Sequence, residues 1–245
     1  MKAYALIMET MLRKRSIFII HVSWLLTYAA LFLIPFPDKM GWNWGIFLFG
    51  WSGCLLPLLL SSGIFGDDIA SGRISLLVTK PIKPVELYSY RLVGLSLQVT
   101  IHLVAASAVI LSLHYLTGRG EVNRFATWLI VAWVVFHAWA ALSTSLSVVL
   151  PRANNSMLLF VLGALSFYLV AMLSVLLPHE LYTKVFTGTV RYAGPPVEFL
   201  SKVGTGQFDA LHSLGSVAHS LVLTATYCAL GILILSRREF KRAGD

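Results

Sequence analysis

The chain has 245 residues, of which 57% are hydrophobic and only 12% are charged, with a net charge of +8. An average soluble domain is about half apolar and about a quarter charged, so this composition excludes a water-soluble globule. The two cysteines, Cys54 and Cys228, each lie inside a long apolar run, which excludes a disulfide-bonded secreted scaffold and indicates buried thiols.

The first fifteen residues (1–15) predict an amphipathic helix. Its apolar side chains, with Leu6 as the exception, share one face of a helical projection: Tyr4, Ile7, Met8, Met11 and Leu12. Lys2, Glu9 and Arg13 lie on the opposite face. Such a segment fits a helix in the inner headgroup layer of a membrane. A frayed basic terminus is the alternative.

Six apolar runs follow, each about the 20 residues that a helix needs to cross a hydrocarbon core about 30 Å thick, or longer. They are 16–35, 44–65, 92–116, 125–150, 156–177 and 213–235. The runs lack strand-like alternation, which favours helices over a barrel. The first run is too long for a signal peptide and lacks a convincing small-residue cleavage site. The sequence therefore predicts an all-α, polytopic membrane protein with six transmembrane helices in a single domain, 1–245.

The basic residues set the expected orientation. Thirteen of the 19 lysines and arginines fall in the N-terminus, the loop after the second run, the link between the fourth and fifth runs, and the C-terminal tail. The positive-inside rule therefore places both termini in the cytoplasm. Topology and attraction to anionic lipid explain the net positive charge, so a nucleic-acid partner is not required.

The loop at 66–91 is longer than a solvated connector needs. It contains a charged turn, an apolar patch at 74–78 and a stop at Pro81. A new helix is expected to begin at Pro84, because proline suits the first helical turn and Glu86 favours the positive helix end. Apolar residues within a charged cytoplasmic loop indicate a docking surface, with a plain connector as the alternative.

Two further features concern packing. The long outer loop at 178–212 predicts short interfacial or re-entrant helices, with an inert lid as the alternative. Small residues spaced four apart predict close helix contacts in the fourth and sixth runs, more readily than a pore lining. These residues are Ala141, Ser145, Ser216, Ser220, Thr224 and Cys228.

The sequence contains few patterns typical of catalytic sites. The chain has no G-x-x-x-x-G-K-[ST] motif for ATP, and His179-Glu180 is followed by Thr183 instead of the second histidine of a zinc protease. No metal site is predicted, and no single helix carries a histidine pair spaced for haem.

Gly50-Trp51-Ser52-Gly53 resembles the G-x-S-G of rhomboid-type intramembrane proteases. An alternative function is thus an intramembrane serine protease that uses Ser52 and His219, although that family carries its serine in the fourth span.

The loop from Asp68 to Tyr88 also carries a family resemblance. It reads Asp68-Ile69-Ala70-Ser71-Gly72-Arg73-Ile74-Ser75-Leu76-Leu77-Val78-Thr79-Lys80-Pro81-Ile82-Lys83-Pro84 before continuing to Tyr88. This stretch is similar to the acidic–Gly–hydrophobic–Pro pattern of the permease subunits of type-2, export-type ABC transporters. Six spans, an amphipathic entry helix and a long last outer loop agree with that family. Gly72-Arg73 departs from its frequent Gly-Thr step.

The resemblance implies a multi-pass permease of the bacterial cytoplasmic membrane, paired with a second permease and bound to separate cytoplasmic ABC ATPases. The chain itself would not be an enzyme and would bind no cofactor, since ATP and Mg²⁺ belong to the ATPase partner. The loop would insert into the ATPase as a coupling element. The residues expected to contact the ATPase are Asp67, Asp68, Arg73, Ile74, Leu76, Leu77, Lys80 and Pro81.

Overall fold

The computed structural model of the chain describes residues 2–12, 19, 21–23, 25–27, 29–30, 60–61, 63–73, 82–118, 122–151, 154–155, 157–158, 179–182 and 210–237. These residues contain helices and turns but no strand. The helices are α1 (Lys2–Leu12), α4 (Gly66–Ala70), α6 (Pro84–Thr117), α7 (Val122–Ser147), α9 (His179–Tyr182) and α12 (Ala210–Arg237). The expectation of an all-helical chain is therefore confirmed for the part that is described.

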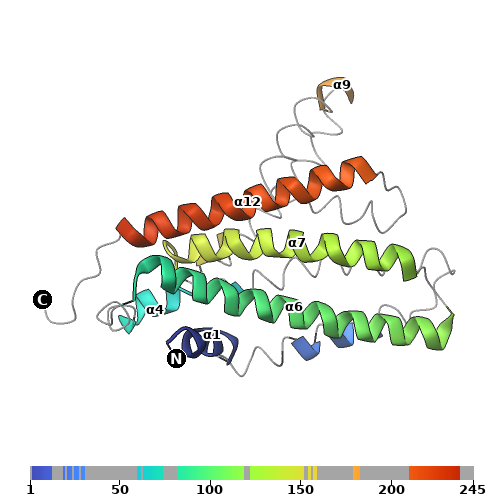
Figure 1. The fold of residues 1–245 in the computed structure, drawn as a ribbon, viewed down its shortest axis with the longest axis horizontal. Helices are drawn as coiled ribbons and strands as arrows, with labels where there is room; N and C mark the ends of the chain where they lie inside the picture. The colour runs from blue at the N-terminus through green and yellow to red at the C-terminus, as the bar shows by residue number, and fades with distance from the viewer. Residues whose placement is uncertain are drawn as a thin grey trace, which may run out of the picture.

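Three helices are long and apolar enough to cross a membrane, over Pro84–Leu116, Leu129–Ser147 and Leu214–Arg237. They lie side by side, and α6 runs in the opposite direction to α7 and α12 (Figure 1). They correspond to the third, fourth and sixth predicted runs. The other three runs and the outer loop lie largely outside the described residues, so the number of six spans stays a prediction.

Helix α6 has well-defined ends. It begins at Pro84, as the sequence predicts, and the backbone N–H of Lys83 donates to the Glu86 carboxylate at 3.1 Å. It ends at Gly118, whose φ of +66° suits glycine and whose N–H donates to the His114 carbonyl at 2.8 Å. Its 34 residues form one continuous rod about 50 Å long. Anything held at its first turns is therefore mechanically joined to its membrane-spanning part.

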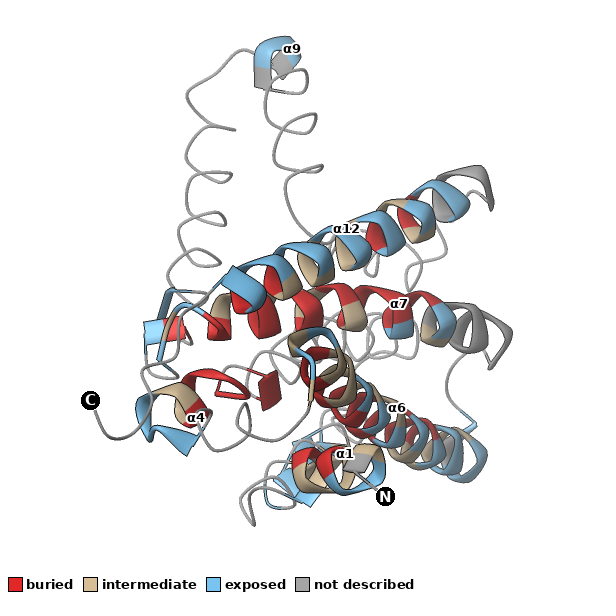
Figure 2. Ribbon diagram, turned by 60° about the vertical axis from the view of Figure 1, so that its left-hand side comes forward, coloured by how far each residue is buried: buried red, intermediate tan, exposed pale blue. Residues whose placement is uncertain are grey.

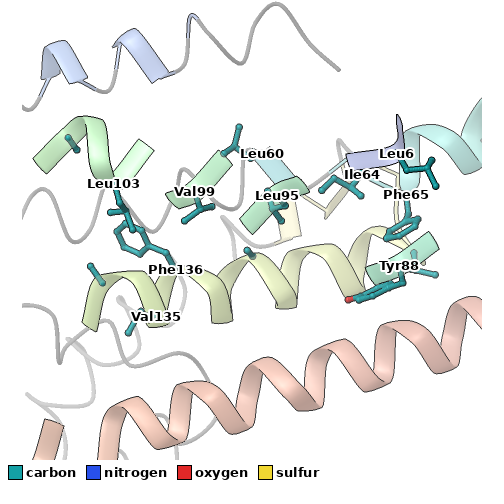
Figure 3. Close-up of a cluster of buried hydrophobic side chains, with 14 of the residues drawn as sticks. Leu6, Leu60, Ile64, Phe65, Tyr88, Leu95, Val99, Leu103, Val135 and Phe136 are labelled. Atoms are coloured by element: carbon teal, nitrogen blue, oxygen red, sulfur yellow. The ribbon is translucent and has the colours of Figure 1, made fainter. Parts of the chain in front are cut away.

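The apolar core lies mainly between α6 and α7. Leu103 on α6 lies against Phe136 on α7, and the cluster extends through Leu95 toward Phe65 and Tyr88 (Figure 3). Buried residues line α7 along most of its described length, whereas α12 is exposed over much of its surface (Figure 2). Helix α7 is thus the central element of the three described long helices.

The short helix α1 packs directly against α6. Its Leu6 and Thr10 are buried, whereas Tyr4 and Leu12 are 68% and 72% exposed. The face that contacts protein is therefore built on Leu6, the exception in the helical projection, and the predicted apolar stripe lies partly outward. The reason is that α1 has apolar side chains on two faces, one that packs on α6 and one that is exposed.

The contact between α1 and α6 depends on Gly94. A Cβ atom at this position would lie 2.7 Å from Thr10 Cβ and 2.9 Å from the Ile7 carbonyl oxygen. A backbone oxygen cannot rotate away, so Gly94→Ala is expected to lower the free energy of unfolding by about 1–3 kcal/mol. Denaturant unfolding of the purified chain in mild detergent measures this loss. Val93→Ala, at an exposed neighbouring position, is the control. Equal stability of the two variants would mean that α1 does not pack on α6.

Candidate functional site

A cluster of charged side chains lies where α1, α4 and α6 meet. The Arg91 guanidinium donates to the Asp68 carboxylate at 3.1 Å, to the Glu9 carboxylate at 3.3 Å and to the Thr10 hydroxyl at 3.0 Å. Arg91 is 0% exposed and Asp68 is 1% exposed. A charge pair this deeply buried is tolerated only when both members form further hydrogen bonds. The Arg91 guanidinium donates hydrogen bonds to three side chains, which come from two other helices.

Arg73 completes the cluster. It forms an ion pair with Glu9, and its guanidinium lies 4.0 Å from the Asp68 carboxylate. Glu9, Asp68, Arg73 and Arg91 therefore form a closed ring, hereafter the charge ring, in which each carboxylate faces both guanidinium groups. Two positive and two negative charges make the ring neutral overall. The ring joins residues that are 64 and 82 positions apart in the sequence.

The local structure of α4 places these charges. Asp67 and Asp68 lie in its first turn, where a helix favours negative charge. Asp68 points into the ring, whereas the Asp67 carboxylate folds back over Gly63. After Ser71, the chain turns at Gly72, whose φ of +70° is a backbone conformation that suits glycine. Arg73 follows this turn immediately.

Helix α6 also holds the end of α1. The Gln98 amide donates to the carbonyl oxygens of Thr10 and Met11 at 3.2 and 2.8 Å. Carbonyl groups in the last turn of a helix have no partner within that helix, so Gln98 supplies one from outside. Together with the bond from Arg91 to the Thr10 hydroxyl, this contact fixes the C-terminal turn of α1 to α6.

An aromatic contact carries the connection to the other long helices. Phe65 stacks on Tyr88 with ring centroids 5.4 Å apart (Figure 3). The Tyr88 and Ser145 hydroxyl oxygens share a 2.9 Å hydrogen bond, and the Ser145 oxygen also lies 2.5 Å from the Tyr227 carbonyl oxygen. The segment before α4 is thereby linked through α6 to α7 and α12.

The structure places three of the eight residues that were expected to contact the ATPase. Asp68 and Arg73 belong to the charge ring, and Asp67 lies beside it. The other five are outside the described residues: Ile74, Leu76, Leu77, Lys80 and Pro81. Sequence reasoning missed Glu9, Arg91 and Tyr88. The available signals were a single carboxylate in a basic N-terminus and an arginine in the first turns of a helix that enters the membrane.

The residues expected to pack helices are all described. The Ser145 hydroxyl lies within hydrogen-bond distance of two carbonyl oxygens, that of Tyr227 on α12 and that of Ala141 in its own helix, and its single proton serves one of them. On α12, Ser216 and Ser220 are buried, whereas Thr224 and Cys228 are half-buried. The Thr224 hydroxyl donates to its own helix, at the Ser220 carbonyl.

Three of the described histidines make polar contacts with side chains of other segments. His21 and His102 face each other with their Nδ1 atoms 2.9 Å apart, and His137 Nε2 lies 2.6 Å from the Ser96 hydroxyl. No group of three or more metal-binding side chains occurs in the described part of the chain. His219 is half-buried on α12. Ser52 lies outside the described residues, so the structure does not test the proposed protease pair.

Comparison with models of known protein families gives no match for this chain. Comparison with curated proteins gives no significant match either. The residues of the loop and the geometry of the charge ring are therefore the features that indicate a function.

Proposed function

We propose that this chain is the transmembrane subunit of an ATP-driven, export-type ABC transporter. It would form the translocation pathway with a second permease subunit in the bacterial cytoplasmic membrane. A separate cytoplasmic ATPase would bind the loop at 66–91 and supply the energy. The charge ring is the observation that carries this proposal, because it joins that loop to a helix long enough to cross the membrane.

The ring provides a direct route for force. A push on α4 reaches Arg91 through the 3.1 Å bond from Asp68, and Arg91 belongs to the continuous helix α6. Glu9 and Thr10 tie α1 to the same guanidinium, so α1 would move with α6. Nucleotide binding can shift a two-state membrane domain only if its partner contacts the two states differently, and such a rigid junction transmits that difference.

A substitution in the apolar patch of the loop tests the proposal. Leu76→Asp is expected to abolish the coupling of ATP hydrolysis to transport, because it places a charge where apolar area should be buried against the ATPase. The chain should remain folded. Transport by reconstituted vesicles and unfolding in detergent measure the two properties separately. Leu76→Met, which keeps the apolar volume, is the matched control and should retain coupling.

A deletion of 73–78 provides a stronger form of the same test. It is expected to remove coupling and to leave the membrane-spanning helices intact. Transport that survives either change would contradict the coupling role of the loop.

Ser52→Ala is expected to leave ATP-driven transport unchanged, whereas it would abolish activity in an intramembrane protease.

Identification of the partner is the most direct experiment. Purification of the chain in mild detergent from its native host is expected to recover an ATPase with a P-loop motif. If the purified chain instead performs its function with no nucleotide-hydrolysing subunit bound, the proposal is wrong.

A further inference from the structure

We propose that Arg73 is a detachable member of the charge ring. Its contact with Glu9 opens and releases the guanidinium to a carboxylate on a docking partner, while Arg91 keeps Glu9 and Asp68 in place. The release is a property of this chain alone. The identity of the partner rests on the proposed function, since the loop that carries Arg73 is the segment proposed to meet the ATPase.

The two halves of the ring differ in their contact with solvent. The side chains of Arg73 and Glu9 are 47% and 28% exposed, whereas Arg91 and Asp68 are almost completely buried. Exposed ion pairs contribute little net stability and are screened by salt, with a Debye length of about 3 Å at 1 M. Buried pairs are screened much less. The outer contact is therefore the weak one, and the inner contact is the strong one.

Arg73 can leave the ring while both carboxylates keep their hydrogen bonds to Arg91. Asp68 keeps its 3.1 Å bond to Arg91, and Arg73 lies 4.0 Å from Asp68, beyond hydrogen-bond distance. Glu9 keeps its 3.3 Å bond to Arg91. The departure of Arg91 would have the opposite effect, because both carboxylates would lose their shared donor.

The chemistry of the released group indicates the partner. A guanidinium forms planar, bidentate hydrogen bonds with carboxylates, so Arg73 is suited to an aspartate or glutamate on the docking surface. Glu9 holds the same guanidinium in the free subunit and therefore competes with that partner. Removing the carboxylate of Glu9 should favour docking, whereas removing the guanidinium of Arg73 should weaken it.

Arginine modification by phenylglyoxal tests the release in the full-length chain in detergent. Residue-resolved mass spectrometry reports the modification rates of Arg73 and Arg91 in the same sample. Glu9→Gln is expected to raise the Arg73 rate by at least threefold and to leave Arg91 unmodified. Addition of 1 M KCl to the wild-type chain is expected to act in the same direction, which provides a test that needs no variant. Glu86→Gln, a carboxylate outside the ring, is the control and should change neither rate.

Two results would overturn the release. One is an Arg73 rate that responds neither to Glu9→Gln nor to salt. The other is simultaneous modification of Arg73 and Arg91, which would mean that the ring opens as a single unit.

The partner is tested separately with the co-purified ATPase. Its affinity for the subunit should fall at least fivefold with Arg73→Gln and increase with Glu9→Gln. Arg73→Lys should restore the affinity only in part, because lysine keeps the charge but lacks the planar fork of the guanidinium. Equal affinities for Arg73→Gln and the wild type would refute the assignment of an acidic partner. Failure to recover any ATPase would refute the proposed function and leave the modification result intact.

Discussion

Replacing Arg91 with methionine is expected to lower the free energy of unfolding by about 3–5 kcal/mol, the largest loss for any single member of the charge ring. The reason is that the Asp68 carboxylate, buried almost completely, loses the guanidinium 3.1 Å away. Thr10 and Glu9 lose the same donor. Denaturant unfolding of the purified chain, followed by its helical circular dichroism, measures the change.

Arg73→Met is the matched control for Arg91→Met, because it removes the same group from the exposed side of the same ring. It should cost no more than about 1 kcal/mol. The double variant Arg91→Met/Asp68→Asn should be less unstable than the sum of the two single variants by about 0.5–3 kcal/mol, since each single variant already breaks the contact between the two side chains. Similar losses for Arg91→Met and Arg73→Met would contradict the burial of the inner pair.

Gly231→Ala is expected to destabilise the chain by about 1–3 kcal/mol through overpacking between α12 and α6. A Cβ atom at this position would lie 2.6 Å from both Cε2 and the hydroxyl oxygen of Tyr88, and 2.8 Å from the Ser145 hydroxyl oxygen. Tyr88 is fully buried and stacked on Phe65, so its ring cannot move aside freely. Thermal unfolding in detergent measures the loss.

Gly215 provides a control within the same helix. A Cβ atom there would meet nothing within 4 Å, so Gly215→Ala should be neutral or stabilising by up to about 1 kcal/mol, because alanine favours a helix. The double variant Gly231→Ala/Tyr88→Phe removes one of the two closest atoms and should recover part of the loss. Equal stability of Gly231→Ala and Gly215→Ala would mean that α12 does not approach Tyr88 closely.

The sequence predicted where helix α6 begins better than it predicted which side of helix α1 packs on protein. Proline at the first turn and Glu86 mark the start of α6 correctly, because capping is a local property. The face of α1 could not be predicted in the same way. Leu6 packs on protein and Leu12 is exposed, and both are apolar because lipid and protein interiors favour the same side chains. A helical projection therefore identifies the apolar stripes without separating the two environments.

The site shows a similar division. Asp68 and Arg73 were singled out by the sequence as residues expected to contact an ATPase, because they stand in a charged loop with a family resemblance, but their ion pairs within the chain were not predicted. Arg91 and Glu9 are separated by 82 positions and meet only through the packing of α1 on α6. The four-residue spacing of small residues identified Ser145, but it gave no information on Tyr88, its partner from a different helix. Contacts of this kind depend on tertiary structure, which neither composition nor periodicity encodes directly.

The order in which the charge ring is synthesised has a consequence for biogenesis. Glu9 leaves the ribosome first, Asp68 and Arg73 follow, and Arg91 emerges last of the four. The N-terminal helix therefore cannot reach its final position cotranslationally until the start of α6 has been translated. Until then Arg73, which is translated before Arg91, is the ring arginine that Glu9 can meet. The packing of α1 on α6 then completes the charge ring.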